Sequence, residues 1–480
     1  MASGVVTYDA VVVGAGPNGL AAAVELQRSG CATLLIEAAD TVGGAARTEE
    51  VTLPGFLHDI GSAIHPLGVG SPFFSSLPLA SFGLEWVHPD APLAHPLPDG
   101  TTAFLERDLD RTASALAEDG RAWTGMFGPC VDRWPTFAEH ILRSPLSVPT
   151  APGLMARFAS LALRPTPSVA RAFRGEAAQA LLAGNAAHAG TPLTHPLTGA
   201  VGATLIAAAH AVGWPCPRGG AGSLTSALAR YFESIGGTIE TGREIQSFSD
   251  VPAARVTLLA LTHRQVAALD DSGLPERYRA RLARWRYGPG AFKVDWALDA
   301  PIPWRDPAIA RAATVHIGGT LADIVRSEAA PLAGQVSEHP FVLLAQPSLF
   351  DPSRAPTGKH TAWAYCHVPN GWTGDATPVI EAQIERFAPG FRDRVLARAS
   401  WGPERLERWN GNLVGGDVNG GVLTLGQTVG TTRWMVPGYR TPRRDLYLCS
   451  ASTPPGGGVH GMAGYHAARA ALKYSLKLAE

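Results

Sequence analysis

The clearest pattern of apolar and polar positions lies near the start of the chain. An apolar run at Tyr8–Val13 is followed by glycines at positions 14, 16 and 19 and by an alanine-rich stretch that continues to Leu26. The apolar run predicts a buried strand, and the alanine-rich stretch predicts a helix. A second apolar run, Ala32–Glu37, predicts a second strand parallel to the first. The segment therefore predicts a strand–helix–strand unit whose first turn is rich in glycine.

The same kind of pattern returns later in the chain. An amphipathic helix is predicted at Ser223–Ile235, followed by a Gly-Gly turn and a strand pair that begins at Thr238. Further buried strands are predicted at Arg255–Leu261 and Leu446–Cys449, and a final helix at Met462–Ala479. We therefore predict one discontinuous domain, assembled from residues 1–65, 212–285 and 415–480.

Residues 66–211 and 286–414 show a different pattern, which predicts a substrate and cap domain. Helices interrupted by Pro and Gly are predicted at Arg111–Asp119, Ala122–Arg143 and Ser168–Leu182. Gly290–Trp304 alternates like a half-exposed strand, Ala362–His367 alternates like another, and a helix is predicted at Pro378–Phe387. The predicted fold class is α/β, with a discontinuous Rossmann-type dinucleotide-binding domain and a second α+β domain of mixed sheet and helical cap. A substrate cavity is expected where the two domains meet.

The three glycines of the first turn have distinct physical roles. Gly14 permits a tight turn out of the strand, Gly16 lets the backbone approach a diphosphate, and Gly19 lets helix and strand lie close together. Glu37 ends the second strand 18 residues after Gly19, where a carboxylate can hold ribose hydroxyls. A unit with glycines only at its turns would leave this acid unexplained. The spacing therefore predicts a dinucleotide-binding site.

Composition and charge narrow the function classes. The 480 residues, 46% hydrophobic and 17% charged, suffice for two intertwined domains. Forty Lys and Arg face 41 Asp and Glu without any basic run, which argues against nucleic-acid binding. Five scattered cysteines without a CxxC pair indicate reduced thiols and no metal site.

The same reading bears on location. The start of the chain lacks a basic segment followed by a long apolar one, so we expect a cytoplasmic protein, with contact to a membrane surface left open. Thr198–Pro215 is the most apolar long stretch, but it is short for a membrane span and His210 interrupts it. We expect a buried helix there.

Motifs spread along nearly the whole chain carry a family resemblance. They are VVVGAGPNGLAAA, GGAART, GFLHDIGSAIHP, VGWPCPRGG with SIGGTIETGREI, YGPGAFKVDWALDAPIPW, and LYLCSASTPPGGGVHGMAGYHAARAAL near the C-terminus. In this order they resemble the phytoene desaturase-like and amine oxidase superfamily of FAD-dependent oxidoreductases, and most of all its pyridine nucleotide-disulfide oxidoreductase domain-containing, retinol saturase-like branch. The resemblance implies FAD as the cofactor. It does not name a substrate, because this scaffold serves many reactions.

The resemblance also implies which residues contact FAD. The first glycine loop would hold the diphosphate, Glu37 the ribose, Arg47 and its glycine pair the flavin side, Ile245 the adenine, and the C-terminal glycine loop the ribityl chain and the pyrimidine edge. The implied cofactor-binding residues are Gly14, Gly16, Pro17, Asn18, Gly19, Glu37, Gly43, Gly44, Arg47, Gly61, Ser62, Ile245, Gly457, Gly458, Gly461 and Met462.

Three residues are candidates for catalysis. Lys293 lies in a stretch that resembles the amine oxidase strand whose lysine approaches flavin N5 through a water. His58, in HDIGSAIH, would act as a base or orient the substrate, and His460, in GGGVHGMAG, would face the flavin. Each has a plainer alternative: a lysine whose stem lies along the sheet, a loop hydrogen bond, and a helix cap.

Further residues of the second domain could line the cavity or belong to the core. Asn185–His188 and His195 lie in the cap region, where histidines in an alanine-rich run are more often core residues. Trp363 and Tyr365, on an alternating strand, would form an aromatic wall or pack in the core.

The predicted function is FAD-dependent removal of a hydride from a C–H or C–N bond of a fairly apolar organic substrate. No second glycine-rich dinucleotide motif follows a later strand, so reoxidation would depend on an external acceptor, oxygen or a quinone. One alternative is a carotenoid or isoprenoid desaturase or isomerase at a membrane surface, for which the basic and apolar stretch Leu154–Arg174 would be the docking face. Another is a binding protein without catalysis that resembles GDP-dissociation inhibitors.

Overall fold

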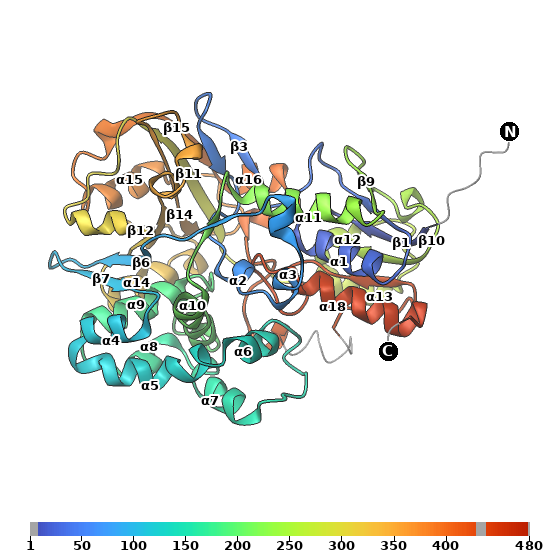
Figure 1. The fold of residues 1–480 in the computed structure, drawn as a ribbon, viewed down its shortest axis with the longest axis horizontal. Coiled ribbons are helices and arrows are strands. Elements are labelled where there is room, and N and C mark those ends of the chain that lie inside the picture. Colours follow the sequence, from blue (N-terminus) through green and yellow to red (C-terminus); the bar gives the residue numbers. More distant parts are fainter. Residues whose placement is uncertain (1–7, 429–437, 479–480) are drawn as a thin grey trace.

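The computed structural model describes residues 8–428 and 438–478, which form two lobes (Figure 1). One lobe is built on a five-stranded sheet in the order β16-β10-β1-β2-β9, and every pairing in it is parallel. Its strands are β1 (Tyr8–Val13), β2 (Thr33–Ile36), β9 (Thr238–Glu240), β10 (Ala254–Leu259) and β16 (Leu446–Leu448). The parallel Rossmann-type sheet that the sequence predicts is confirmed.

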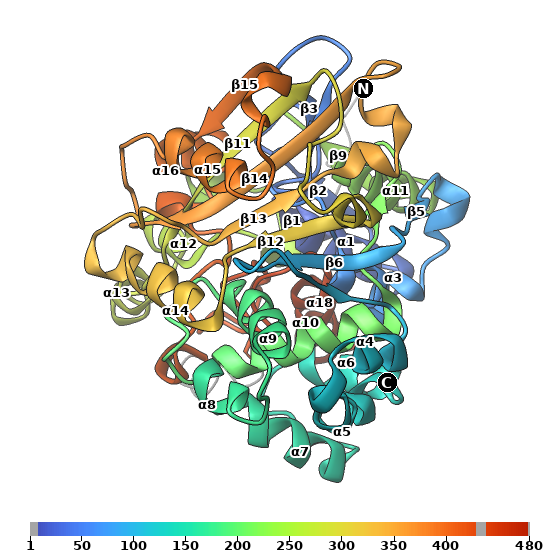
Figure 2. The ribbon, with the colours of Figure 1, turned by 90° about the vertical axis from the view of Figure 1, so that its left-hand side faces the viewer.

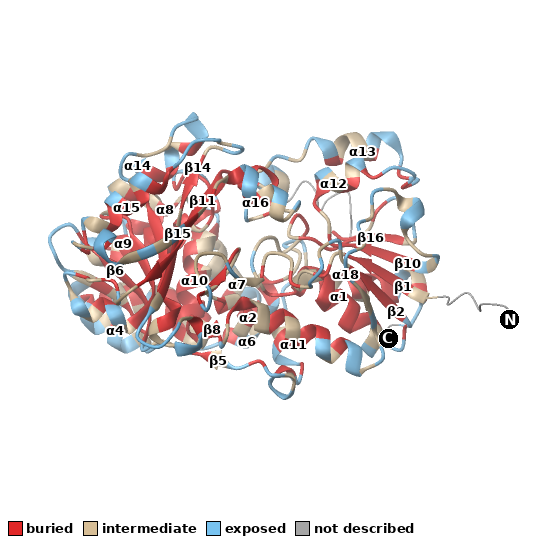
Figure 3. Cartoon of the chain, turned by 90° about the horizontal axis from the view of Figure 1, so that it is seen from above, coloured by how far each residue is buried: buried red, intermediate tan, exposed pale blue. Residues whose placement is uncertain are grey.

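Alternate residues of this sheet enter two separate cores. Ala10 and Val12 of β1 pack with the helices on one face, which are α1 (Pro17–Arg28), α11 (Ala221–Ser234) and α18 (Met462–Ala471). Val11 and Val13 point to the opposite face, toward α12 (His263–Ala268) and α13 (Glu276–Ala283). Because both faces are covered, β2 and β16 are buried throughout and β1 and β10 over their last four residues, as in other parallel sheets, while the edge strand β9 is not buried (Figure 3).

The second lobe is built on a mixed seven-stranded sheet in the order β15-β11-β14-β13-β12-β6-β7. Only β12 and β6 run parallel to each other; the other neighbours are antiparallel. Its strands are β6 (Ala91–Pro96), β7 (Thr102–Leu105), β11 (Gly290–Leu298), β12 (Ala312–Ile317), β13 (Val342–Ala345), β14 (His360–Val368) and β15 (Val395–Trp401). Two short antiparallel pairs lie outside these sheets: β3 (Thr48–Glu50) with β4 (Leu57–Asp59), and β5 (Trp86–Val87) with β8 (Cys216–Pro217).

Helices cover both faces of the second sheet. Val294 and Trp296 of β11 face a core closed by α15 (Thr377–Glu385), while the opposite face looks toward the cap helices (Figure 2). The cap and peripheral helices are α2 (Pro66–Val69), α3 (Pro72–Ser75), α4 (Leu109–Ala115), α5 (Gly120–Val131), α6 (Trp134–Ile141), α7 (Pro152–Ala162), α8 (Thr166–Ala170), α9 (Glu176–Ala187), α10 (Thr198–Val212), α14 (Leu321–Ala329) and α16 (Pro403–Trp409). The stretch that was expected to be a buried helix forms α10.

Some predicted elements differ from the structure. A strand pair was predicted after Ser234, but this segment contributes a single strand, β9. β9 lies at the edge of the sheet and pairs with β2. The strand predicted as half-exposed, β11, is buried throughout, since one face meets α15 and the other faces the cap. The predicted cap segment also supplies β6 and β7 to the second sheet, which its proline-rich and glycine-rich pattern had hidden.

Three predicted helices end or divide at identifiable residues. Ala122–Arg143 divides into α5 and α6 because the chain leaves helical geometry at Arg133 before Pro135. Ser168–Leu182 divides into α8 and α9, the second of which starts after Gly175. The last helix is α-helical only to Ala471 and continues as a π-turn at Leu472–Leu476. The strands of each sheet come from the segments expected for each domain, while the domain boundaries themselves stay a prediction. Among the described residues, no helix is both long and apolar enough to cross a membrane.

Candidate functional site

One long cavity of about 940 Å³ runs between the two sheets. One part, which we call the nucleotide end, is bordered by the loop after β1, the end of β2 and the segment around Ile245. The other part, which we call the chamber, is bordered by the second sheet and the cap, including Lys293, Trp363 and His188. The nucleotide end lies at the carboxyl ends of the parallel strands, where such sheets bind ligands.

The glycine loop after β1 is shaped by close backbone contacts. Gly14 has a φ of 97°, a left-handed value that glycine tolerates. A Cβ on Gly19 would lie 1.8 Å from the carbonyl oxygen of Gly14, so no larger residue fits without moving the backbone. Helix α1 starts at Pro17 with Gly16 as its N-cap, and no side chain caps its first amides. Its N-terminus therefore remains available for an anion in the cavity.

Glu37 borders the nucleotide end directly after β2. Its two carboxylate oxygens accept the backbone amides of Ala15, at 2.6 Å, and Ala39, at 3.0 Å. These bonds hold the carboxylate at the mouth of the glycine loop and leave further lone pairs for hydroxyl donors. Ile245 borders the same end, together with Arg243.

A second glycine loop packs on the first. A Cβ on Gly44 would lie 2.8 Å from the Cα of Gly16, so the two loops touch backbone to backbone. Arg47 borders the cavity, donating from Nε to the Gly44 carbonyl at 3.2 Å and from Nη2 to the Trp409 carbonyl at 3.2 Å. Its guanidinium also lies 4.3 Å from the Trp409 ring centre. Arg47 thus links the loop to a segment of the other lobe.

That segment, Leu406–Leu413, crosses the nucleotide end, and sequence reasoning did not identify it. We call it the strap. Asn412 fixes it to the first lobe, because its amide oxygen accepts from the amide of Thr262 at 3.0 Å and its amide nitrogen donates to the carbonyl of Ala260 at 2.9 Å. The Asn-Gly-Asn sequence after Trp409 is a turn signal, but nothing local shows where the turn docks.

On the face of the second sheet that looks into the chamber, side chains of neighbouring strands lie opposite one another. Strand register places Lys293 opposite Tyr365, and Tyr365 opposite Leu343. Lys293 is buried, and both oxygens of Asp295 lie 2.6 Å from its Nζ. Its Nζ is 5.5 Å from the ring centre of Trp363, which also borders the chamber. Burial lowers the pKa of Lys293, although the carboxylate of Asp295 opposes the shift.

His58 lies behind this wall and does not border the cavity. Its Nε2 is 2.8 Å from the hydroxyl of Thr52, and its Nδ1 is 3.5 Å from a carboxylate oxygen of Asp295. The structure therefore brings His58 and Lys293 to the same carboxylate. His58 therefore does not contact a ligand in the cavity directly, as the prediction of a catalytic base would require.

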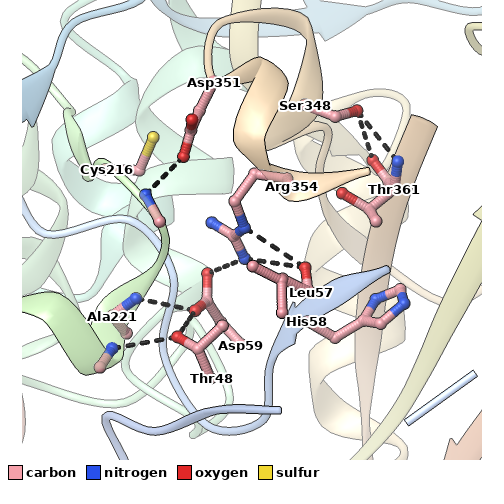
Figure 4. A network of polar contacts seen from close by, with 12 residues as sticks. Thr48, Leu57, His58, Asp59, Cys216, Ala221, Ser348, Asp351, Arg354 and Thr361 are labelled. Carbon is pink, nitrogen blue, oxygen red and sulfur yellow. Dashed lines mark hydrogen bonds and ion pairs between the residues drawn. The ribbon is translucent and has the colours of Figure 1, made fainter. Parts of the chain in front are cut away.

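A buried ion pair next to these residues connects the lobes (Figure 4). Nη2 of Arg354 lies 2.7 Å from Asp59, and both side chains are fully buried. Asp59 also accepts from the hydroxyl of Thr48 and from the amide of Ala221, at the start of α11. Burial by itself would raise the pKa of Asp59, but the guanidinium and these donors hold the pKa below its usual value.

This ion pair supports the loop Ile60–His65, which forms one wall of the cavity. A Cβ on Gly61 would lie 2.1 Å from the Ala45 carbonyl oxygen, so this wall also lies close to the second glycine loop. The hydroxyl of Ser62 is 3.0 Å from Nε2 of His65, whose pKa burial lowers to about 4. Gly61 and Ser62 both border the cavity.

The C-terminal glycine loop reaches the cavity only in part. Gly458 borders it, whereas Gly457, Gly461 and Met462 do not. His460 is buried away from the cavity, and its Nδ1 accepts the amide of Met462 at 3.0 Å. The imidazole thus caps α18.

The structure brings most of the predicted site residues to one cavity. Those that border it are Gly14, Gly16, Pro17, Asn18, Gly19, Glu37, Gly44, Arg47, Gly61, Ser62, Ile245, Lys293 and Gly458. The other predicted site residues do not border it; they are Gly43, His58, Gly457, His460, Gly461 and Met462. His188, Trp363 and Tyr365 also border it, while Asn185 and His195 do not. The roles of all these residues stay predictions.

The nucleotide end fits a bound dinucleotide. A Cβ on Gly19 or Gly44 would collide with the backbone of a neighbouring glycine, and Gly14 has a left-handed φ of 97°, so glycine is needed at all three positions of these narrow loops. The open N-terminus of α1, the carboxylate of Glu37 and the guanidinium of Arg47 supply groups for diphosphate and ribose.

Comparisons with known proteins agree with this geometry. Residues 12–75 match the model of the NAD(P)-binding Rossmann-like domain. The chain is 29% identical to pyridine nucleotide-disulfide oxidoreductase domain-containing protein 2 of Rattus norvegicus, over 96% of this chain and 92% of the relative. It is 26% identical to phytoene dehydrogenase of Streptomyces griseus, over 81% of this chain and 77% of the relative. Its fold resembles wild-type putrescine oxidase bound to putrescine, with a TM-score of 0.61 and 17% identity over 96% and 97% of the two chains.

Proposed function

Because the chain belongs to the phytoene desaturase and amine oxidase superfamily of FAD-dependent oxidoreductases, we propose that it binds FAD along this cavity and oxidises a fairly apolar substrate in the chamber. The observation that carries the proposal is that one cavity extends from the glycine loops after β1 and β2 to a chamber bordered by a buried lysine. A binding protein without catalysis would not need that connection.

In this proposal the nucleotide end binds FAD and the chamber positions the substrate. The α1 N-terminus and Arg47 hold the diphosphate, Glu37 holds the ribose, and the strap excludes water from the nucleotide end. FAD, when bound, supplies a two-electron acceptor for the hydride of a C–H or C–N bond. We assign its reoxidation to an external acceptor, oxygen or a quinone.

Lys293 is the proton-handling group in this proposal. Lys293 borders the chamber, and its lowered pKa makes proton exchange easier than for a lysine in water. Asp295 holds Nζ in place through two short contacts. His58 then acts through Asp295, and His460 positions α18 through its cap on Met462.

A desaturase-type reaction at a membrane surface is the second candidate. It is favoured by an exposed apolar and basic surface around α7, where Val148 is 85% exposed and Leu163 58% exposed next to Arg157 and Arg164. Cosedimentation with anionic liposomes tests this membrane-surface candidate, and the variant Leu163→Asp should abolish the cosedimentation.

We place the protein in the cytoplasm, which the unpaired state of all five cysteines supports.

The first test of the proposal is an absorbance spectrum of the purified protein. A flavin spectrum, release of FAD on denaturation, and bleaching by a substrate under anaerobic conditions are the expected results. Gly16→Val should abolish flavin retention, because its side chain would fill the approach to the diphosphate and meet the Gly44 loop. A colourless preparation that takes up no added FAD would contradict the proposal.

A further inference from the structure

Three histidines, two of them buried and His188 partly buried, pack against one another in a row that ends at the chamber. They are His188, which follows α9, His316 on β12, and His95 on β6, in the part of the molecule where α9 and α10 lie beside these strands (Figure 2). Nε2 of His188 lies 3.0 Å from Nε2 of His316, and Nε2 of His95 lies 2.8 Å from the carbonyl oxygen of Gly319. Of the three, only His188 borders the cavity.

Burial keeps all three rings neutral. It lowers the pKa of His188 to about 3 and that of His95 to about 4, and it lowers the pKa of His316 well below its usual value. Each ring therefore carries a single N–H proton at neutral pH, and the remaining question is which nitrogen holds it.

The hydrogen bonds settle the position of each proton. His95 must carry its proton on Nε2, because the Gly319 carbonyl can only accept. Nδ1 of His316 has no partner in the described part of the chain and faces Gly184, where a Cβ would lie 2.6 Å from it. A buried N–H without a partner is rarer than a bare lone pair, so His316 carries its proton on Nε2 and donates it to His188.

His188 then carries its own proton on Nδ1. Within residues 8–428 and 438–478, this nitrogen has no hydrogen-bond partner. The ring is held edge-on to Trp214, with centroids 5.6 Å apart, and Trp214 also borders the cavity. The chain of histidines thus presents a fixed N–H donor at the wall of the chamber.

Other polar groups of the chamber are also short of acceptors. Nε1 of Trp363 and the hydroxyl of Thr314 are buried at this wall, and neither has a partner in the described residues. The carboxylates that border the cavity, Glu37, Glu244 and Glu407, lie at the nucleotide end and on α16. Among the described residues, the charged group that borders the chamber is the ammonium of Lys293, whose partner Asp295 does not border the cavity. A cationic substrate would therefore meet donors and this ammonium, while the acids that border the cavity lie elsewhere along it.

We propose that His188 is a substrate-recognition residue whose Nδ1–H donates to an oxygen on an otherwise apolar, uncharged substrate, so that the chamber takes ketones, esters and similar oxygenated hydrocarbons and rejects primary amines. This inference rests on the proposed function, because it assigns the substrate class of the same chamber. It separates this chain from the diamine oxidation that the name of putrescine oxidase describes.

Three nearly isosteric probes test the inference by equilibrium dialysis against the purified protein. They are 2-acetylnaphthalene, which offers a carbonyl acceptor, 2-ethylnaphthalene, which offers none, and 1-(2-naphthyl)ethylamine, which is a cation at pH 7.5. We expect the ketone to bind roughly three- to tenfold more tightly than the hydrocarbon, the range of one net hydrogen bond, and the amine to bind most weakly.

Variants identify the donor. His188→Phe should remove the preference for the ketone while leaving the affinity for 2-ethylnaphthalene within about twofold. The exposed His339 provides the matched control, and His339→Phe should keep the preference. An unchanged ketone preference in His188→Phe, or an amine that binds as tightly as the ketone, overturns the inference.

The proton position is measured independently of any ligand. Long-range ¹H–¹⁵N correlation spectra of protein labelled with ¹⁵N-histidine distinguish the two neutral forms, and the His188→Phe spectrum assigns the signal. We expect His188 as the neutral Nδ1–H form at pH 7.5, and the Nε2–H or cationic form overturns the inference. A preparation without flavin would reject the proposed function, while dialysis and spectra would still decide the role of His188.

Discussion

The nucleotide end and the chamber belong to one cavity but are built in different ways. The nucleotide end is formed mainly by backbone: glycine loops in contact with each other, an open helix N-terminus, and one carboxylate held by amides. The chamber is formed by side chains from β11, β12, β13 and β14 and from the cap. Backbone geometry is specified by a few neighbouring residues, whereas the side-chain wall depends on the register of distant strands. Under the proposed function, the first end can therefore be shared by many enzymes, while the second sets the substrate.

The largest effect is expected at the junction that holds the two ends together. Arg354→Met leaves Asp59 buried without its cation, so the free energy of unfolding should fall by about 3–5 kcal/mol in urea denaturation. Arg174→Met, which removes an exposed ion pair with Glu118, is the control and should leave the free energy of unfolding nearly unchanged. Adding Asp59→Asn to Arg354→Met should recover part of the loss; equal losses for Arg354→Met and Arg174→Met would contradict a structural role for the pair.

A change in the chamber should affect reaction but not cofactor binding. Lys293→Met removes the ammonium that borders the chamber, and flavin reduction by substrate should slow by roughly 10²-fold while flavin content stays constant. Stopped-flow absorbance under anaerobic conditions measures the rate. Lys359→Met, at an exposed position, should leave the rate unchanged. If reduction by Lys293→Met is as fast as in the wild type, this lysine has no part in the chemistry.

A change at the nucleotide end should show the reverse pattern. Gly19→Ala places a Cβ 1.8 Å from the Gly14 carbonyl oxygen, so the loop must shift at a cost of about 2 kcal/mol, and the flavin should be lost on gel filtration. Gly125→Ala is the matched control, because a Cβ there meets nothing within 4 Å in α5. It should keep its flavin. Retention of flavin by Gly19→Ala would show that the glycine loop is not the binding element.

The smallest effect concerns acid stability of the chamber. The pKa of His188 is lowered from 6.5 to about 3 by burial, so between these values the unfolded chain binds a proton that the folded chain does not. Its contribution is fully present above pH 6.5 and is lost as the pH falls, by about 1.3 kcal/mol between pH 7.0 and pH 5.5. His188→Phe should therefore lose less stability over this interval in urea denaturation. The same pH dependence in both proteins would exclude this titration.

The sequence predicts the nucleotide end better than the chamber, for physical reasons. Gly14, Gly19 and Glu37 are close in sequence, and their spacing alone specifies a turn, a close contact and an acid at a strand end. That Lys293 and Tyr365 each lie on a strand could be predicted, because both segments alternate clearly; the register that places them opposite each other comes from the structure. The roles that were predicted for these residues still need the experiments above.

Other parts of the site could not be predicted because no local pattern carries them. His316 and Thr314 lie on β12, a strand that the sequence reading did not identify, and their place depends on its pairing with β13 and β6. The strap, likewise, is recognised only through the bonds of Asn412 with Thr262 and Ala260. His58 and His460 lie in motifs near the cavity, yet the fold turns both imidazoles away from it.

The distribution of the cavity wall along the chain has a consequence for biosynthesis. Segments that border the cavity come from the start of the chain, from residues 243–269, from the strap, and from residues 450–459. Under the proposed function, a ribosome must therefore translate almost the entire message before the prosthetic group can be enclosed. Cofactor loading would then be a late event of maturation, and a prematurely terminated product would keep the glycine motif without the later segments of the cavity wall.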